Sequence, residues 1–427
     1  MFVSPLLTAC FGPNLLTSGL PLTATASDLV ARCVGNVSGV RRTDQNEAAC
    51  FSFFSGTMSL LDLVSGFATR VADAYYGPPL ITDATGTEEE YLAKYHEIPD
   101  ASKKNKPTIL GEGAFGTVRL VRDVESDKAN AGDSDGGKNH FAAKVLCKGY
   151  SINDDNTVFH PPKAGVLETE VKILRRLQGQ AYNLKLVGVY EGRRYLYLVM
   201  ELCLGGDLHD FRSACLQYYS RGNDGVGVSS ASTALLPADV VREVTIRILK
   251  AVGHCHRHGV IHRDLKPANA MFVQTFDPTG DARPTEYVEG LRLIDYGSGC
   301  ADDPPSNDEA SEPKQHTTMA GSAFYNSPEM FARKYTYKTD IWSAGVTIYA
   351  FAAGFPEGDR LQSVVDTMHK APSKGERDIK GGMMPPACAD SLPDSFWEML
   401  DKSLLVYRHK KRPSADIVLD SCEFLRG

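Results

Sequence analysis

The spacing of hydrophobic residues divides the chain into a strand-rich segment and a helix-rich segment that follows it. Short apolar runs between glycine and polar residues predict two strands over 109–121, one over 140–146 and one over 195–202. From about residue 240 to the end, apolar residues recur mainly at helical spacing. Strands first and helices afterwards favour two lobes over a single mixed sheet.

Three stripes of apolar residues predict amphipathic helices. The first predicts a helix near 60–76, with Ser59 as its N-cap and a Gly-Pro-Pro sequence at its end. The stripes are Leu60, Val64, Phe67 and Val71, then Leu167, Val171, Leu174 and Leu177, then Val241, Val244, Ile248 and Val252. Polar and charged composition predicts a linker over 80–106 and polar inserts over 123–140 and 219–234.

Composition and charge exclude several classes of protein. The chain has 427 residues, 42% of them hydrophobic, and 46 Lys and Arg against 53 Asp and Glu give a formal net charge of −7. These values are typical of globular proteins and exclude collagen-like and wholly disordered chains. The mild acidity argues against nucleic acid as a partner. No membrane span is expected, because no apolar run reaches the required length of about 18 residues.

The cysteines and the N-terminus bear on location in the cell. Ten cysteines are scattered along the chain without a C-x-x-C pair, which fits a reducing compartment better than a disulfide framework. The first 27 residues carry no charge, lack the basic start of a secretory signal and are interrupted by prolines. We expect a cytoplasmic protein with an unstructured N-terminus, and N-terminal targeting stays open as the alternative.

Residues 111–116, Gly-Glu-Gly-Ala-Phe-Gly, have the G-x-G-x-x-G spacing of nucleotide-binding proteins. In a dinucleotide-binding fold this sequence opens a helix, whose N-terminus holds the pyrophosphate. Here residues 117–121 follow with the alternation of a strand. The sequence therefore favours a strand–glycine–strand hairpin whose bare backbone can approach phosphates closely. A plain glycine hairpin is the remaining alternative.

Lys144 ends the apolar run 141–144, Phe-Ala-Ala-Lys, inside a predicted strand. Burial of an ammonium group is costly unless a carboxylate pairs with it. Glu170 is the natural partner because it adjoins the apolar stripe of the following helix, and Glu168 is the competing one. In the alternative interpretation, Lys144 lies at a strand edge in water.

The longest pattern combines groups suited to phosphoryl transfer. Residues 262–269 read His-Arg-Asp-Leu-Lys-Pro-Ala-Asn, and residues 295–297, Asp-Tyr-Gly, follow a short apolar run. Phosphoryl transfer needs oxygen ligands for a metal ion, a carboxylate near the attacking hydroxyl and cations on the phosphates. These two segments supply each of those groups.

Over residues 107–424 the chain resembles the eukaryotic-type protein kinases. Residues 327–329, Ser-Pro-Glu, are similar to the family's A-P-E sequence, and residues 340–345 are similar to its D-x-W-S-x-G sequence. Arg412 is similar to the late arginine that pairs with the A-P-E glutamate, here Glu329. Because small-molecule kinases share the early motifs but not these late ones, the resemblance favours a protein substrate.

The resemblance implies a two-lobed α+β fold. A small β-rich N-lobe with one main helix would cover about 107–200, and a larger α-helical C-lobe about 205–424. Residues 1–106 would be an N-terminal extension, mostly loop. Its helix near 60–76 is expected to pack on the kinase domain as structural cover, with a docking or autoinhibitory role as the alternative.

The resemblance also implies ATP and Mg²⁺ as ligands and assigns residues to them. Asp264 would accept the proton of the substrate hydroxyl, and Lys266 would neutralise the transferred phosphoryl group. Asn269 and Asp295 would bind Mg²⁺, which prefers hard oxygen ligands. The implied nucleotide-binding residues are Gly111, Glu112, Gly113, Ala114, Phe115, Gly116, Val118, Ala142, Lys144, Glu170, Glu201, Cys203, Asp207 and Met271.

The form of residues 264–269 resembles serine/threonine kinases, because tyrosine kinases usually carry Arg and Ala in that stretch. The implied function is a serine/threonine protein kinase. The alternative is a pseudokinase scaffold that binds ATP without transfer. Such proteins usually lose residues equivalent to Lys144, Asp264 or Asp295, and all three are present here.

Arg263 precedes Asp264, as in kinases whose activation loop is ordered by a phosphate on an arginine pocket. In the loop over about 298–321, Thr317 and Thr318 are candidate phosphorylation sites, for an upstream kinase or for autophosphorylation. Alternatively, the acidic residues of the loop supply enough negative charge: Asp302, Asp303, Asp308, Glu309 and Glu312.

Residues 254–258, His-Cys-His-Arg-His, are not expected to form a zinc site, because adjacent helical residues point in different directions. No calcium-binding helix pairs follow the kinase-like region in this sequence. We therefore expect any built-in regulator to lie in the N-terminal hundred residues.

Overall fold

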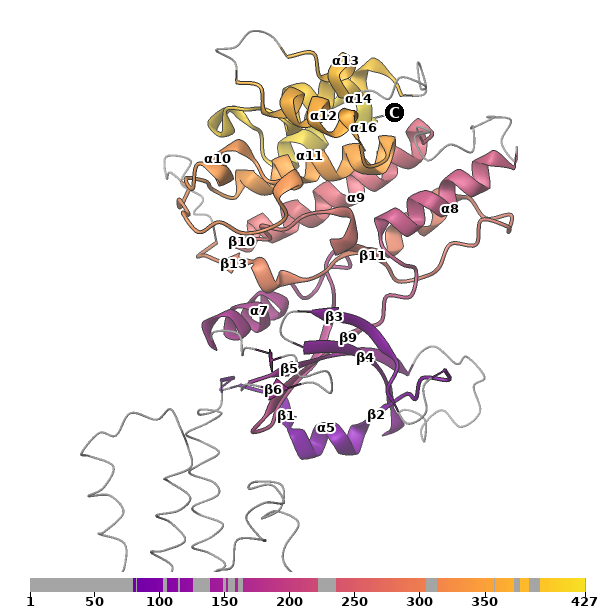
Figure 1. The fold of residues 1–427 in the computed structure, drawn as a ribbon, viewed down its shortest axis with the longest axis vertical. Helices are drawn as coiled ribbons and strands as arrows, with labels where there is room; N and C mark the ends of the chain where they lie inside the picture. The colour runs from indigo at the N-terminus through magenta and orange to yellow at the C-terminus, as the bar shows by residue number, and fades with distance from the viewer. Residues whose placement is uncertain are drawn as a thin grey trace, which may run out of the picture. The chain divides into compact units, whose positions relative to one another are not determined.

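The computed structural model describes residues 80–426, except for 82, 103–105, 114–115, 126–138, 149–150, 153–157, 160–163, 222–235, 305–312, 357, 372–376 and 384–391. The predicted helix near 60–76, Ala114, Phe115 and most of the two predicted inserts lie outside the described residues. The described elements form a β-rich lobe and a helical lobe (Figure 1). This arrangement confirms the predicted two-lobed α+β fold.

The N-lobe contains a seven-stranded sheet of order β1-β8-β9-β5-β4-β2, with β3 paired to β4. Its strands are β1 (Gly86–Thr87), β2 (Tyr95–Glu97), β3 (Ile109–Gly113), β4 (Gly116–Asp123), β5 (His140–Cys147), β8 (Leu186–Glu191) and β9 (Tyr195–Glu201). The lobe also contains α5 (Glu88–Lys94), α7 (Ala164–Arg176) and the short ribbon of β6 (Ser151–Ile152) and β7 (Val158–Phe159). The predicted strands and the helix carrying the second stripe are confirmed.

The prediction of a linker over 80–106 is wrong, because β1, α5 and β2 lie within it. Thr87 begins α5 with both hydrogen bonds of a capping box. Tyr91 and Tyr95 are buried against the sheet, and the Tyr91 ring stacks on Tyr197 with 4.1 Å between centroids. Tyr91 is the one buried residue of this short helix and Tyr95 already belongs to β2, so the amino-acid composition of α5 is that of a polar segment.

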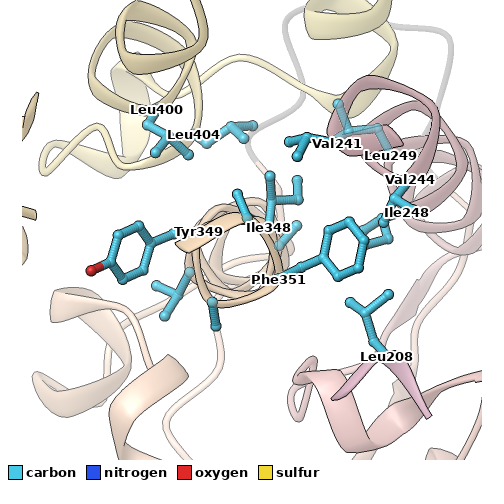
Figure 2. Close-up of a cluster of buried hydrophobic side chains, with 14 of the residues drawn as sticks. Leu208, Val241, Val244, Ile248, Leu249, Ile348, Tyr349, Phe351, Leu400 and Leu404 are labelled. Atoms are coloured by element: carbon cyan, nitrogen blue, oxygen red, sulfur yellow. The ribbon is translucent and has the colours of Figure 1, made fainter. Parts of the chain in front are cut away.

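The C-lobe is built around α11 (Lys338–Ala353), whose residues after its first position are all buried. Figure 2 shows Ile348, Tyr349 and Phe351 of α11 between Val241, Val244 and Ile248 of α9 on one side and Leu400 and Leu404 on the other. The third predicted stripe is thus the core-facing side of α9 (Ala238–Arg257). The other α-helices described in this lobe are α8 (Leu208–Ser220), α10 (Pro328–Phe331), α12 (Asp359–His369), α13 (Ile379–Met383), α14 (Asp394–Met399), α15 (Ala415–Ser421) and α16 (Glu423–Arg426).

Short strands and short helices connect the α-helices of the C-lobe. The strands are β10 (Val260–Ile261), β11 (Ala270–Phe272), β12 (Leu291–Leu293) and β13 (Cys300–Ala301). The 3₁₀ helices are η2 (Pro267–Asn269), η3 (Pro284–Gly290), η4 (Tyr296–Ser298), η5 (Ala323–Tyr325) and η8 (His409–Lys411), and η7 (Leu400–Leu404) is a π-helix. Among the helices described, none combines the length and the hydropathy needed to cross a membrane.

Candidate active site

The loop of residues 262–269 is held by a buried carboxylate on α11. Asp340 accepts hydrogen bonds from the backbone N–H groups of His262, at 2.8 Å, and Arg263, at 2.9 Å. Burial opposes ionisation of Asp340, but the hydrogen bond and charge of His256 outweigh it, so the pKa lies below its ordinary value. Arg263 has a positive φ of 66°, a strained conformation that these two bonds support.

The carboxylate of Asp264 lies at the centre of a polar cluster. Lys266 Nζ donates to Asp264 Oδ2 and to Ser322 Oγ, both at 2.9 Å. The Ser322 hydroxyl donates to Asp264 Oδ1 at 2.9 Å. Asn269 Nδ2 donates to the backbone oxygen of Asp264 at 2.8 Å and to its Oδ2 at 3.2 Å. Because both bonds use the amide nitrogen, the amide oxygen is the group with which Asn269 can bind a cation.

A short hairpin brings Asn269 and Asp295 to the same place. Strands β11 and β12 pair antiparallel with Ala270 opposite Leu293, so Asn269 enters and Asp295 leaves the hairpin at one end. The backbone N–H of Ile294 donates to the backbone oxygen of Asn269 at 3.0 Å. Asp295 has a left-handed backbone, with φ 59°, and its side chain accepts a hydrogen bond from the N–H of Gly297. Two residues with oxygen-bearing side chains therefore lie at the same end of this hairpin.

Lys144 joins the N-lobe to this cluster. Its Nζ lies 2.6 Å from Glu170 Oε1 and 3.7 Å from Asp295 Oδ1. Glu170 is buried on α7, whereas Glu168 is exposed, so Lys144 pairs with Glu170. Strand β5 lies between β4 and β9, which rules out the edge-strand interpretation.

The ionisation of Lys144 and Asp295 follows from this contact. Burial alone would lower the pKa of Lys144, but the charges of Glu170 and Asp295 raise it above the ordinary value. Burial alone would raise the pKa of Asp295, but the charges of Lys144 and His262 bring it below the ordinary value. Both groups are therefore charged at neutral pH.

The glycine-rich segment forms the predicted hairpin of β3 and β4, with Gly113 opposite Gly116. A Cβ atom added to Gly116 would lie 2.0 Å from the backbone oxygen of Val145, so no side chain fits there. A Cβ added to Gly111 would have no neighbour within 4 Å, and Glu112 is exposed. A strand follows the last glycine, which excludes the dinucleotide-binding arrangement for this segment.

The other residues of the predicted nucleotide contacts lie on β4, β5, β9 and β11. Val118 is opposite Lys144, Ala142 is opposite Met200, and Met271 is bridged to Asp207. The structure does not bring every predicted side chain to the catalytic cluster, as two carboxylates illustrate.

The carboxylates of Glu201 and Asp207 have local partners. Glu201 Oε1 accepts from the N–H of Lys185 at 2.7 Å and lies 3.3 Å from Arg292 Nε. Asp207 Oδ1 caps α8 through two backbone N–H groups. Cys203 is half-buried, and burial raises its pKa to about 12, so its thiol is protonated at neutral pH. For Glu201 and Cys203, only the main chain is suited to contact a nucleotide base.

Sequence reasoning missed Ser322. Gly321 has a positive φ of 80°, and a Cβ there would lie 2.2 Å from the backbone oxygen of Arg263. This close approach of the two segments places the Ser322 hydroxyl on Asp264. A glycine followed by a small hydroxyl residue at the end of the predicted loop is the signal that could have indicated this contact.

Arg263 connects the catalytic loop to the segment over 298–321. Its guanidinium donates to the backbone oxygens of Ser298, at 2.6 Å, and Gly299, at 2.9 Å. It also donates to the hydroxyl of Tyr335, which in turn donates to the backbone oxygen of Thr318 at 2.6 Å. The side chains of Thr317 and Thr318 are exposed. The main chain of Thr318, one of the two candidate phosphorylation sites, therefore lies two hydrogen bonds from Arg263.

Among the described residues, one group of three side chains could hold a metal ion: Cys300, Asp302 and His316. His316 Nε2 lies 2.8 Å from Asp302 Oδ2, and Lys314 Nζ lies 2.6 Å from Asp302 Oδ1. Burial raises the pKa of Cys300 to about 11, which keeps its thiol protonated. We interpret this group as an ion-pair network between two parts of the same segment.

The histidines of residues 254–258 do not converge. His254 Nε2 lies 3.3 Å from the backbone oxygen of Leu177, whereas His256 Nε2 lies 3.0 Å from Asp340 Oδ2. His258 Nδ1 lies 2.8 Å from the backbone oxygen of His254. The rings of His254 and His258, four positions apart, lie 4.3 Å from each other, whereas His256 faces Asp340, so the three rings do not share one site.

Comparison with known proteins gives a consistent result. The model of the protein kinase domain family matches residues 105–422. Calcium-dependent protein kinase 32 of Arabidopsis thaliana is 29% identical over 343 residues, which are 80% of this chain and 50% of that protein. Calcium-dependent protein kinase 26 of Oryza sativa subsp. japonica is 37% identical over 247 residues, 58% of this chain and 36% of that protein. The chain spans about half the length, or less, of these relatives.

Proposed function

The chain belongs to the protein kinase family, and from that premise we propose that it transfers the γ-phosphate of ATP to serine and threonine hydroxyls of protein substrates. The observation that carries the proposal is the convergence of Lys144, Asp264, Lys266, Asn269 and Asp295 from both lobes. These groups are a base, two cations and two oxygen ligands, which is the set that phosphoryl transfer requires.

Asp264 is proposed as the acceptor of the substrate's proton. Its Oδ1 already accepts a hydrogen bond from the Ser322 hydroxyl at 2.9 Å. A serine or threonine hydroxyl of a substrate would find the same acceptor at the same distance. Lys266 bonds the other carboxylate oxygen, so its charge lies where the transferred group would carry negative charge. This geometry orients the hydroxyl and screens the phosphoryl group.

Mg²⁺ fits the donors present. The carboxylate of Asp295 is ionised, and the amide oxygen of Asn269 lies at the same end of the β11–β12 hairpin. Hard oxygen ligands shared with phosphates suit Mg²⁺. When bound, the ion would supply charge neutralisation at the phosphates. Lys144, kept charged by Glu170, would hold the α- and β-phosphates of ATP.

The glycine hairpin and the neighbouring strands are proposed to contact the rest of the nucleotide. The bare backbone at Gly111, Gly113 and Gly116 would fold over the phosphates. Val118, Ala142 and Met271 would sandwich the adenine, main-chain groups of Glu201 and Cys203 would bind its edge, and Asp207 would reach the ribose. The fit at Gly116, where no side chain is possible, supports a hairpin that approaches its neighbours closely.

Phosphorylation of Thr317 or Thr318, by an upstream kinase or by autophosphorylation, is proposed to regulate the enzyme. The exposure of both residues and the link from the main chain of Thr318 through Tyr335 to Arg263 support this proposal. The alternative is that acidic side chains of the segment replace the phosphate. Asp302, which binds Lys314 and His316, is one described side chain that contributes to that charge.

We further propose that the catalytic domain covers about 107–424 and that the protein works in a reducing compartment such as the cytoplasm. The six cysteines among the described residues are all free thiols, which supports the second proposal. The names of the relatives mention calcium dependence, and we propose no calcium site for this chain.

The test is transfer of labelled phosphate from ATP to a degenerate peptide library, with Asp295→Ala as the control. The proposal expects Mg²⁺-dependent labelling of serine and threonine peptides by the wild type and a loss of labelling in the variant. Labelling of tyrosine alone would contradict the proposed specificity. ATP binding without any transfer, by a protein also phosphorylated at Thr317 and Thr318, would instead establish the pseudokinase scaffold.

A further inference from the structure

The N-terminal strap, which we define as residues 80, 81 and 83–87, is anchored on the N-lobe by a buried carboxylate. The backbone N–H groups of Leu80 and Ile81 donate to the two oxygens of Glu191, at 2.7 and 2.9 Å. Lys148 Nζ lies 2.5 Å from Glu191 Oε1, and both side chains are almost fully buried, with 3% and 6% exposed. Charge-assisted bonds to a carboxylate are stronger than neutral ones, so this anchor fixes the strap firmly.

The strap also adds a strand to the sheet. The N–H of Thr85 donates to the backbone oxygen of Val189 at 2.6 Å, and the N–H of Val189 donates to the Thr85 hydroxyl at 2.9 Å. Strand β1 then pairs parallel with β8, with Gly86 opposite Tyr190. Figure 1 shows β1 at the edge of this sheet. The strap is thus tied to β8 at both of its ends.

Between these two ties the strap contacts α7. Ile81 is only 6% exposed and belongs to the same buried cluster as Leu167, Val171 and Leu174 of α7. Arg175, in the last turn of α7, donates to the carboxylate of Asp83 and, at 2.6 Å, to its backbone oxygen. A shared buried cluster and the contact between Arg175 and Asp83 therefore link the strap to α7.

The position of α7 determines whether the catalytic ion pair can form. Glu170 projects from α7 to Lys144 of β5, and the contact between them is 2.6 Å. A displacement of α7 by little more than 1 Å would exceed hydrogen-bond distance. The strap is bound to β8 of the same sheet that contains β5, so it fixes the helix relative to the lysine.

We propose that the N-terminal strap acts in cis as a clamp on α7 and thereby positions Glu170 on Lys144, with Ile81 and Asp83 as positioning residues. This inference rests on the proposed function for its effect on activity. The segment before residue 107, for which the sequence alone predicts a linker, would then help to keep the kinase domain in an active conformation.

The first experiment compares Ile81→Asp with Ile81→Val and with Leu92→Asp in the full chain. Leu92 lies on α5 and is 57% exposed, so it controls for a new charge beside the strap. Ile81→Asp is expected to raise KM for ATP and to lower kcat, so that kcat/KM falls by about tenfold. This is the effect of losing one charge-assisted hydrogen bond. Ile81→Val and Leu92→Asp are expected to stay within about twofold of the wild type.

Amide hydrogen exchange gives a readout that does not depend on catalysis. In Ile81→Asp the amides of 164–176 in α7 are expected to exchange faster, while those of α9 keep their protection. A wild type without phosphotransfer would refute the proposed function and leave this measurement valid. Unchanged exchange of α7 together with unchanged kinetics would overturn the clamp.

Asp83→Ala keeps the proposal testable if Ile81→Asp does not fold. Asp83 is exposed, so the variant is expected to fold, and its pair with Arg175 is expected to have a small effect. We expect faster exchange confined to the last turn of α7 and a KM for ATP raised by up to about twofold. The same exchange as the wild type in that turn would overturn the clamp.

Discussion

Each lobe contains a pair of a cation and a buried carboxylate, and the two pairs differ in how completely they are satisfied. In the C-lobe, Arg412 contacts Glu329 through its two terminal nitrogens, Nη1 at 2.5 Å and Nη2 at 3.3 Å. The side chains of Arg412 and Glu329 are 0% and 6% exposed. In the N-lobe, Lys144 makes one contact with Glu170, is 22% exposed and has Asp295 at 3.7 Å. We call the first pair closed, because its hydrogen-bonding groups are satisfied within the protein, and the second open, because its lysine is partly exposed.

The chemistry of the two cations explains the difference. The remaining donors of Arg412 are bonded to the backbone oxygens of Val406 and Lys338, so its planar fork is saturated within the protein. Lys144 has three donors on a compact ammonium, and the described contacts engage it with two carboxylates only. A closed pair has no capacity for a ligand and serves the fold, whereas an open pair can bind one.

Glu329→Gln is expected to have the largest effect, on stability. The substitution keeps the shape of the side chain but leaves the fully buried Arg412 without its counter-charge. Breaking a buried pair in this way costs about 3–5 kcal/mol of unfolding free energy. Urea unfolding measures it, with Glu398→Gln of an exposed pair as the control, expected to lie within about 0.5 kcal/mol of the wild type. Equal stability of both variants would refute the distinction between closed and open pairs.

Glu170→Gln is the matched change in the open pair, and its effect is expected on activity. Lys144 keeps Asp295 as a partner and is partly exposed, so the unfolding free energy is expected to fall by less than about 1 kcal/mol. Loss of the charge-assisted bond is expected to lower kcat/KM by about 10- to 100-fold. Steady-state phosphotransfer kinetics and urea unfolding on one preparation check both values. A variant that loses stability and keeps activity would reverse our assignment of the two pairs.

Tyr296→Phe tests a buried hydrogen bond that lies beside the open cluster. The Tyr296 hydroxyl is buried and donates to Asn183 Oδ1 at 2.7 Å, while its ring lies 4.9 Å from that of His262. Phenylalanine keeps the ring and removes the bond, so we expect a loss of about 1 kcal/mol in unfolding free energy. Combined with Asn183→Ala, the effect is expected to be non-additive. Strict additivity in the double mutant would show that the bond contributes nothing.

The smallest expected effect is a pH dependence at the junction of the lobes. Burial, followed by the positive charge of His258, lowers the pKa of His254 below 6.5, while its ring contacts the backbone oxygen of Leu177. In that range the unfolded chain binds more protons, so the stability contributed by neutral His254 is present above pH 6.5 and is lost as pH falls through the folded-state pKa. In His254→Gln, the unfolding free energy is expected to fall less steeply between about pH 7 and 5 than in the wild type. A slope identical to that of the wild type would contradict this assignment.

The sequence predicted the fold where hydrophobic spacing and packing agree. The stripe from Val241 to Val252 is the core face of α9, and the run ending at Lys144 is an interior strand. The linker prediction failed because α5 buries a single tyrosine, Tyr91, among charged residues, and a helix of seven residues offers too few positions to establish a period.

The candidate site was predictable in its residues and not in its contacts. A lysine in an apolar strand requires a carboxylate, which is why Glu170 could be named before the structure. Ser322 on Asp264 and the strap on α7 depend on chain segments that meet only in the folded protein. Local pattern contains no information on such long-range contacts.

The central claim is that the open cluster binds a nucleotide together with Mg²⁺. The most direct test is calorimetric titration of ATP into the wild type and Asp295→Asn, each with and without Mg²⁺. Our account predicts that Mg²⁺ strengthens ATP binding to the wild type and that this gain disappears in the variant. No ATP uptake by the wild type with Mg²⁺ present, or the same gain in both proteins, would contradict it.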